Sequence, residues 1–189
     1  MKLHTLFILL ALSCLLLGCV ADPRPRPYGF PRMELPAHKY QTFQNDGCPF
    51  TFDYPVYGQL EAERIDSCFF NIYFPRFGCR WHVTGRIFEP QKKIDYNHTY
   101  EDFRELVYKH TQKGSIYESR LRTEHGQGVM YELYGEVPTS AEFYFSDSTS
   151  YALTTSFYFD TAVRNDSLRP LIDYMKTDLQ HMVSSLRWK

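Results

Sequence analysis

Acid–base chemistry is the first possibility that the sequence raises, because Asp178 and His181 lie three residues apart in a segment with helical periodicity. This spacing places both side chains on one face of a helix, where a carboxylate can orient an imidazole as a base. The same spacing is more typical of an exposed contact on a helix surface, which is the interpretation we adopt. His110 borders the apolar side of another predicted helix and is expected to be a partly buried histidine with a hydrogen-bond partner.

Sequence motifs of the common enzyme classes are absent. The chain has no Gly-x-Ser-x-Gly motif, no phosphate-binding loop, no Rossmann glycine pattern and no His-Glu-x-x-His zinc motif. We therefore expect no catalytic residue, no cofactor and no bound metal ion.

Covalent lipidation is the chemistry that best fits the N-terminal residues. Lys2 precedes an apolar run from Leu6 to Leu17, which is too short for a comfortable membrane span and has the layout of a secretory signal. Its end, Leu16-Leu17-Gly18-Cys19, resembles the lipobox of bacterial lipoproteins. In that family the signal peptide is removed before the cysteine, which then carries the lipid, so Cys19 is the predicted lipidation site.

Two alternatives to this site stay open: cleavage at Cys14, and an uncleaved anchor or ordinary secretory signal over residues 4–20 with a chance cysteine. With Cys19 acylated, each buried methylene of a chain such as palmitate contributes about 0.8 kcal/mol to membrane binding. The prediction is thus a bacterial membrane lipoprotein that faces the periplasm.

Disulfide formation is open to the three cysteines of the body of the chain, Cys48, Cys68 and Cys79. An exported domain can oxidise two of them, and none has the Cys-x-x-Cys spacing of zinc or redox sites. If a strand over 58–64 separates its two neighbouring strands, Cys48 and Cys68 meet at one end of the sheet; if those neighbours pair directly, Cys48 lies nearer Cys79. We favour a Cys48–Cys68 bond with Cys79 free, and three reduced cysteines are the alternative.

Charge and length restrict the class of protein. Removal of residues 1–18 takes away one charge, Lys2, so the remaining basic and acidic residues are nearly balanced. That balance argues against nucleic-acid binding, which needs a basic surface. We predict a lipoprotein signal peptide over 1–18, a lipid-anchored tether over 19–39 and a single domain over 40–189.

The tether is rich in proline, and alternating prolines favour an extended polyproline II conformation. Such a segment would reach on the order of 50 Å from the membrane. It either presents the domain at a distance or runs along the domain surface.

Hydrophobic patterns predict strands and two helices. One helix is expected to begin at Thr99 as its cap and to end at Gly114, and a second, amphipathic helix runs from about Ser167 to Arg187. Pro75 to Gly78 should turn one strand into the next as a hairpin. The strands are expected at about 50–56, 58–64, 68–74, 79–88, 116–123, 129–136, 140–146 and 151–159.

Aromatic side chains on successive residues indicate how the sheet is covered. The segments 142–145 and 156–159 carry such residues, whereas a half-exposed strand would alternate with polar side chains. Both faces of the sheet should therefore be covered. The predicted fold is α+β, an antiparallel sheet of about six or seven strands with helices on its faces, in other words an α/β/α sandwich.

Other aromatic residues lie in turns or tails, where burial is not guaranteed. Exposed aromatic clusters mark protein interfaces, while the alternative is that these rings fold back and cap the edges of the core. These residues are Tyr28, Phe30, Tyr57, Phe77 and Trp188.

Several motifs together resemble the gliding motility lipoprotein GldD family, almost throughout the chain from Cys19 onward. In order, they are the Pro-rich stalk, Cys48-Pro49-Phe50-Thr51-Phe52-Asp53-Tyr54-Pro55, Cys68 before Asn71-Ile72-Tyr73-Phe74-Pro75, Leu106-Val107-Tyr108-Lys109-His110-Thr111, Phe143-Tyr144-Phe145-Ser146-Asp147-Ser148-Thr149, Asp166-Ser167-Leu168-Arg169-Pro170 and Trp188-Lys189. The family pattern includes cysteines like Cys48 and Cys68 and none that matches Cys79. The order of elements also looks like the Mog1/PsbP type of sandwich.

The resemblance implies a component of the gliding and type IX secretion apparatus without enzymatic activity. Its implied partners are membrane proteins of that apparatus, among them GldE, and the lipid bilayer through Cys19. The alternatives are a periplasmic enzyme or thiol-redox protein that uses Cys79 or the Asp178/His181 pair, and a lipoprotein that binds a small ligand.

Overall fold

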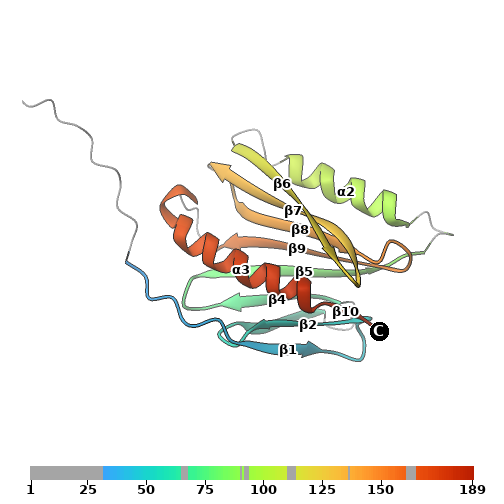
Figure 1. The fold of residues 1–189 in the computed structure, drawn as a ribbon, viewed down its shortest axis with the longest axis horizontal. Helices are drawn as coiled ribbons and strands as arrows, with labels where there is room; N and C mark the ends of the chain where they lie inside the picture. The colour runs from blue at the N-terminus through green and yellow to red at the C-terminus, as the bar shows by residue number, and fades with distance from the viewer. Residues whose placement is uncertain are drawn as a thin grey trace, which may run out of the picture.

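The computed structural model describes residues 32–64, 68–89, 91, 94–109, 114–135, 137–160 and 165–189. These residues form two antiparallel sheets and two long helices (Figure 1). In chain order the elements are β1 (Tyr40–Gln44), β2 (Phe50–Pro55), β3 (Gln59–Arg64), β4 (Phe69–Phe74), β5 (Cys79–Ile87), α2 (Tyr96–Lys109), β6 (Gly114–Thr123), β7 (Gly126–Gly135), β8 (Thr139–Ser146), β9 (Tyr151–Phe159), the 3-10 turn η4 (Asn165–Leu168), α3 (Arg169–Ser185) and β10 (Arg187–Trp188).

The main sheet has seven strands in the order β3-β4-β5-β9-β8-β7-β6, and every neighbouring pair is antiparallel. A smaller sheet in the order β1-β2-β10 lies beside α3 (Figure 1). The predicted hairpin over Pro75–Gly78 is confirmed, because β4 and β5 pair from Phe74 and Cys79 outward. Short connections lead to antiparallel neighbours, so most of this order follows from loop length.

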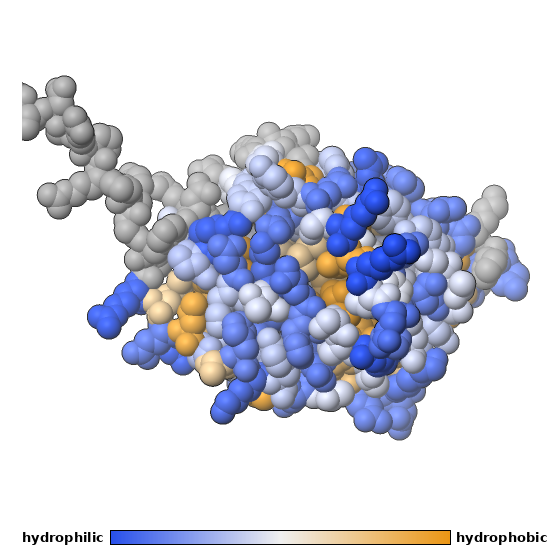
Figure 2. All heavy atoms as spheres, in the orientation of Figure 1, coloured by the Kyte–Doolittle hydropathy of each residue, from blue (hydrophilic) through white to orange (hydrophobic). Residues whose placement is uncertain are grey.

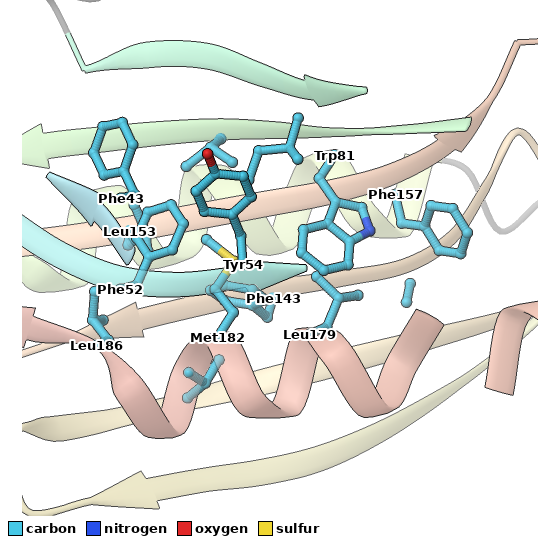
Figure 3. Close-up of a cluster of buried hydrophobic side chains, with 14 of the residues drawn as sticks. Phe43, Phe52, Tyr54, Trp81, Phe143, Leu153, Phe157, Leu179, Met182 and Leu186 are labelled. Carbon is cyan, nitrogen blue, oxygen red and sulfur yellow. The ribbon is translucent and has the colours of Figure 1, made fainter. Parts of the chain in front are cut away.

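The two faces of the main sheet carry separate apolar cores. On one face α3 and the smaller sheet cover β4, β5, β9 and β8. The labelled side chains Leu179 and Met182 of α3, and Leu186 directly after it, project toward the aromatic rings of the core (Figure 3). On the other face α2 covers β7 and β8 through Phe103 and Val107. The predicted α/β/α arrangement is therefore confirmed, and the surplus of aromatic residues is explained by the two cores.

The first helix begins earlier than predicted. α2 starts at Tyr96, and the carboxylate of Asp95 accepts a hydrogen bond from the amide of His98 at 2.9 Å, which makes Asp95 the cap. Thr99 lies inside the helix, where its hydroxyl donates to the Asp95 carbonyl at 2.8 Å. Asp and Thr are both favourable N-cap residues, and the prediction of Thr99 in place of Asp95 was wrong.

The predicted cysteine pairing rested on a strand arrangement that the structure does not have. β2 belongs to the smaller sheet and β3 to the edge of the main sheet, so neither predicted placement of the strand over 58–64 is found. A disulfide nevertheless joins Cys48 and Cys68, whose Cα atoms lie 5.4 Å apart, and Cys79 is a free, buried cysteine. The bond ties the start of β2 to the start of β4 and so links the two sheets.

Removing this bond should destabilise the domain. Its sequence separation is 20 residues, and closing a loop of that size in the unfolded chain corresponds to about 3 kcal/mol. We expect the double variant Cys48→Ala/Cys68→Ala to lower the free energy of unfolding, measured in urea, by about that amount. A reductant should lower the stability of the natural chain to the same level and leave the variant unchanged; a reductant effect on the variant would contradict this assignment.

The surface on the α3 side of the molecule is mainly hydrophilic, with apolar surface visible in patches between polar side chains (Figure 2). Within the described ranges, no helix is both long enough and apolar enough to cross a membrane.

Candidate functional site

The most unusual group in the domain is the carboxylate of Asp178, which is 0% exposed on α3. The expectation of an exposed contact between Asp178 and His181 is wrong. Asp178 occupies a position on the apolar face of the helix, between Met175 and Met182, and that face packs on the sheet. A buried charge is costly unless hydrogen-bond donors surround it.

Three side chains from outside α3 contact this carboxylate. His38 Nδ1 lies 2.6 Å from Asp178 Oδ1, the Tyr40 hydroxyl donates to the same oxygen at 2.9 Å, and the Tyr57 hydroxyl donates to Oδ2. His38 and Tyr40 lie at the start of β1 and Tyr57 follows β2, so two separate segments meet at one acidic group of α3. We call these four residues the Asp178 cluster.

The tyrosines of the cluster are held in their donor state. Burial, followed by the hydrogen bond to Asp178, raises the pKa of both Tyr40 and Tyr57 above the ordinary value. Both hydroxyls therefore keep their protons over the whole physiological pH range. The carboxylate thus has fixed donors that replace the water it lost on folding.

Aromatic stacking surrounds the cluster. The ring of Tyr174 lies 4.4 Å from the ring of His38, and its hydroxyl donates to the Pro36 carbonyl at 2.7 Å. The ring of His181 lies 3.6 Å from that of Tyr40, and its Nε2 is 3.5 Å from a carboxylate oxygen of Asp53. His181 therefore does not make the predicted contact with the Asp178 carboxylate, and its acidic neighbour is Asp53.

The contacts of the cluster fasten residues 32–39 to the domain. The Val56 amide donates to the Lys39 carbonyl at 2.9 Å, and Met33 packs against the larger core. The described part of the predicted tether thus runs along the domain surface, the second of the two possibilities that the sequence left open. The cluster lies at the junction between that segment and the folded sheet.

The chemistry open to this cluster is limited. Among the described residues, the side chains that hydrogen-bond to Asp178 are an imidazole and two phenols. No serine, threonine or cysteine takes part, so the nucleophile that a His–Asp pair would activate in acyl transfer is not supplied. The side chain of His38 is 36% exposed and the carboxylate is fully covered, which suits a structural clamp.

Cys79 is the other group that the sequence proposed for chemistry. It opens β5 and is 0% exposed, and burial raises the pKa of its thiol. A protonated, enclosed thiol is a poor nucleophile. Cys19 and His110 lie outside the described residues.

Three of the five candidate docking aromatics cap the core. Tyr57, Phe77 and Trp188 are partly buried against it, and the Trp188 indole N–H donates to the His125 carbonyl at 2.9 Å. Tyr28 and Phe30 lie outside the described residues. For the described three, the alternative that the rings fold back is the correct one.

Sequence reasoning missed most of the Asp178 cluster. A signal for Asp178 was present, since an acidic residue in register with the apolar face of a helix predicts a buried charge. No local signal marks His38, Tyr40 or Tyr57, because their partner is 121 to 140 residues away in the chain.

Two further polar features lie on the α2 side of the main sheet. Glu142 is 1% exposed and accepts a hydrogen bond from the Ser156 hydroxyl at 3.2 Å, and His82 lies opposite Ser156 in the sheet. An open hollow of about 520 Å³ lies between α2 and β6, with Tyr96 and Arg120 among its lining residues. Among the described residues, no group of three or more His, Cys, Asp or Glu side chains is placed to hold a metal ion.

The family model of the gliding motility lipoprotein GldD matches residues 21–188. The chain belongs to this family. The match covers the domain and the segment that the Asp178 cluster fastens to it, and it places the chain among membrane-associated lipoproteins of the gliding machinery. A search of curated proteins finds no match.

Solved structures similar to this chain include one yeast protein and one cyanobacterial protein. The Ran-binding protein Mog1p of Saccharomyces cerevisiae is 10% identical, with a TM-score of 0.50 over 80% of this chain and 96% of that chain. Cyanobacterial PsbP from Synechocystis sp. PCC 6803 is 10% identical, with a TM-score of 0.44 over 84% of this chain and 98% of that chain. The likeness to Mog1p shows that this GldD-family chain shares its α+β fold and no more than the fold.

Proposed function

We propose that this chain is a lipid-anchored periplasmic component of the gliding and type IX secretion machinery that acts by binding other proteins and not by catalysis. The observation that carries the proposal is the family match over residues 21–188, which begins two residues after the predicted lipidation site, Cys19. Lipid at Cys19 would hold the chain at the bilayer. Residues 32–39, which are packed against the domain, would then connect that anchor to the domain.

The state of the candidate chemical groups supports a binding role. The Asp178 carboxylate is saturated by donors and enclosed, and the Cys79 thiol is buried with a raised pKa. The hollow beside α2 is open and contains Glu118, Arg120 and Arg122, so it is not the deep apolar pocket that a lipid- or steroid-like ligand would need. We propose membrane proteins of the apparatus as partners, with GldE as the one that the family resemblance implies.

The test is capture of the partner from membranes. Full-length chain with an affinity tag replaces the natural copy, cells are treated with a short amine-reactive crosslinker, and captured proteins are identified by mass spectrometry. We expect a membrane protein of the gliding or secretion machinery, enriched at least about tenfold over an untagged strain. Recovery of the chain alone, from cells that glide normally, would contradict the docking role.

Genetic replacement separates binding from catalysis. Deletion of the chain should abolish gliding, and the variant Cys79→Ala/His181→Gln should restore it fully, because neither side chain is needed for docking in this proposal. Failure of that variant to restore gliding, at normal abundance of the protein, would favour the enzymatic alternative.

A further inference from the structure

β6 is a long strand at an open edge of the main sheet (Figure 1). It has ten residues, and its register with β7 is regular from Gly114 to Thr123. Six of the ten side chains are exposed, and Tyr117, at 67%, is the most exposed large hydrophobic residue of the described chain. A regular exposed edge presents a row of backbone donors and acceptors on which another strand can add.

The opposite edge of the sheet is built differently. β3 has six residues, and its register with β4 shifts between Glu61 and Arg64. Short edge strands and irregular registers are devices that block the addition of a further strand. The same sheet therefore has one blunted edge and one that is left open.

The charged side chains of β6 indicate what charges an added strand must carry to complement this edge. Glu118 and Arg120 are two residues apart, so both side chains lie on the α2 face of the sheet. Within the described ranges, no ion pair involves Arg120 or Arg122. The change of sign from Glu118 to Arg120 makes the strand complementary to itself in the antiparallel register in which each of these side chains faces the other.

We propose that β6 pairs antiparallel with β6 of a second copy of this chain, about a two-fold axis at Ser119. In this register Glu118 faces Arg120 of the partner subunit, and Arg120 faces Glu118 of the partner subunit. Tyr117 faces Leu121 of the partner subunit, which covers the exposed ring. A shift by one pair in either direction places Glu118 or Arg120 opposite itself, and like charges directly opposite each other destabilise a strand pair. The interface is isologous, and it joins the two seven-stranded sheets into one continuous sheet.

Cysteine crosslinking tests the register in the full-length chain in its membrane. Directly opposite residues of antiparallel strands have Cα atoms about 4.5–5.5 Å apart, within the range of a disulfide. Ser119→Cys should give a covalent dimer on mild oxidation, because this position meets itself. Tyr117→Cys and Leu121→Cys should each form no covalent dimer when made alone, and should form one when the two variants are made in the same cell.

Charge reversal tests the pairing itself. Sedimentation of the full-length chain in detergent should show a dimer, and E118R or R120E should each weaken it roughly tenfold or more, since each creates two like-charge pairs. The double variant E118R/R120E should restore dimerisation. Tyr108→Phe is the matched control, because it removes the hydroxyl that donates to Glu118 and leaves both charges, so the dimer should persist.

Each opposite outcome overturns the proposal. A chain that stays monomeric throughout, a dimer that does not crosslink through Ser119→Cys, or a double variant as weak as the single ones would each exclude this interface. Unfolding of a variant is detected separately by its thermal transition, and the crosslinking results do not depend on the charge variants.

Discussion

Replacing Asp178 with alanine should lower the free energy of unfolding by about 3–5 kcal/mol, because each buried donor that loses its acceptor costs about 1–3 kcal/mol. The carboxylate is 0% exposed and contacts His38, Tyr40 and Tyr57. Its loss leaves two phenol groups and an imidazole without their acceptor, and it opens a cavity beneath α3. Against a total stability of about 5–15 kcal/mol for a domain, this is a severe loss.

The chain offers a matched control on the same helix. Asp173 is an exposed acidic residue of α3, with a side chain 51% exposed, and pairs with Arg169 at 3.0 Å. Exposed pairs of this kind contribute about 0–1 kcal/mol, so Asp173→Ala should change the urea midpoint little. Equal effects of the two substitutions would show that the Asp178 cluster does not stabilise the domain beyond an ordinary surface contact.

A second measurement follows the segment that the cluster fastens. Hydrogen exchange of the amides of residues 32–39 should become faster in Asp178→Ala, because His38 and Tyr40 lose their common acceptor. His38→Ala should release the same segment while costing much less global stability, since that side chain is 36% exposed. A variant that loses stability with unchanged exchange in 32–39 would separate the core role of Asp178 from its role as a clamp.

Features set by local pattern were predictable from this sequence. The strands near 116–123, 140–146 and 151–159 and the apolar face of α3 follow from residue periodicity and turn residues. The covering of both sheet faces also followed, because runs such as Phe143-Tyr144-Phe145 leave no polar side to face solvent.

Features that depend on contacts between distant residues were not predictable. β2 pairs with β1 and with β10, a two-residue strand at the chain end, and no hydrophobic period in the sequence signals that sheet. The same is true of the Asp178 cluster, whose members come from both ends of the domain. Placing Cys48 beside Cys68 required the relation between two sheets, which strand order along the chain does not contain.

The second large effect concerns Cys19. The variant Cys19→Ala, made as the full-length chain, should move from the membrane fraction to the soluble periplasmic fraction. A single acyl chain binds membranes only marginally, and two or more chains together hold a protein stably. We expect that this variant does not restore gliding to a deletion strain.

Two controls give this result its meaning. Cys14→Ala should remain in the membrane fraction and restore gliding, because cleavage before Cys19 discards Cys14 with the signal peptide. The thermal unfolding of Cys19→Ala should match that of the natural chain, because the contacts that fasten residues 32–39 do not involve the lipid. If Cys19→Ala stays in the membrane fraction, residues 4–20 act as an uncleaved anchor and the lipidation site is wrong. If it is soluble and still supports gliding, the anchor is dispensable and docking alone places the protein at the machinery.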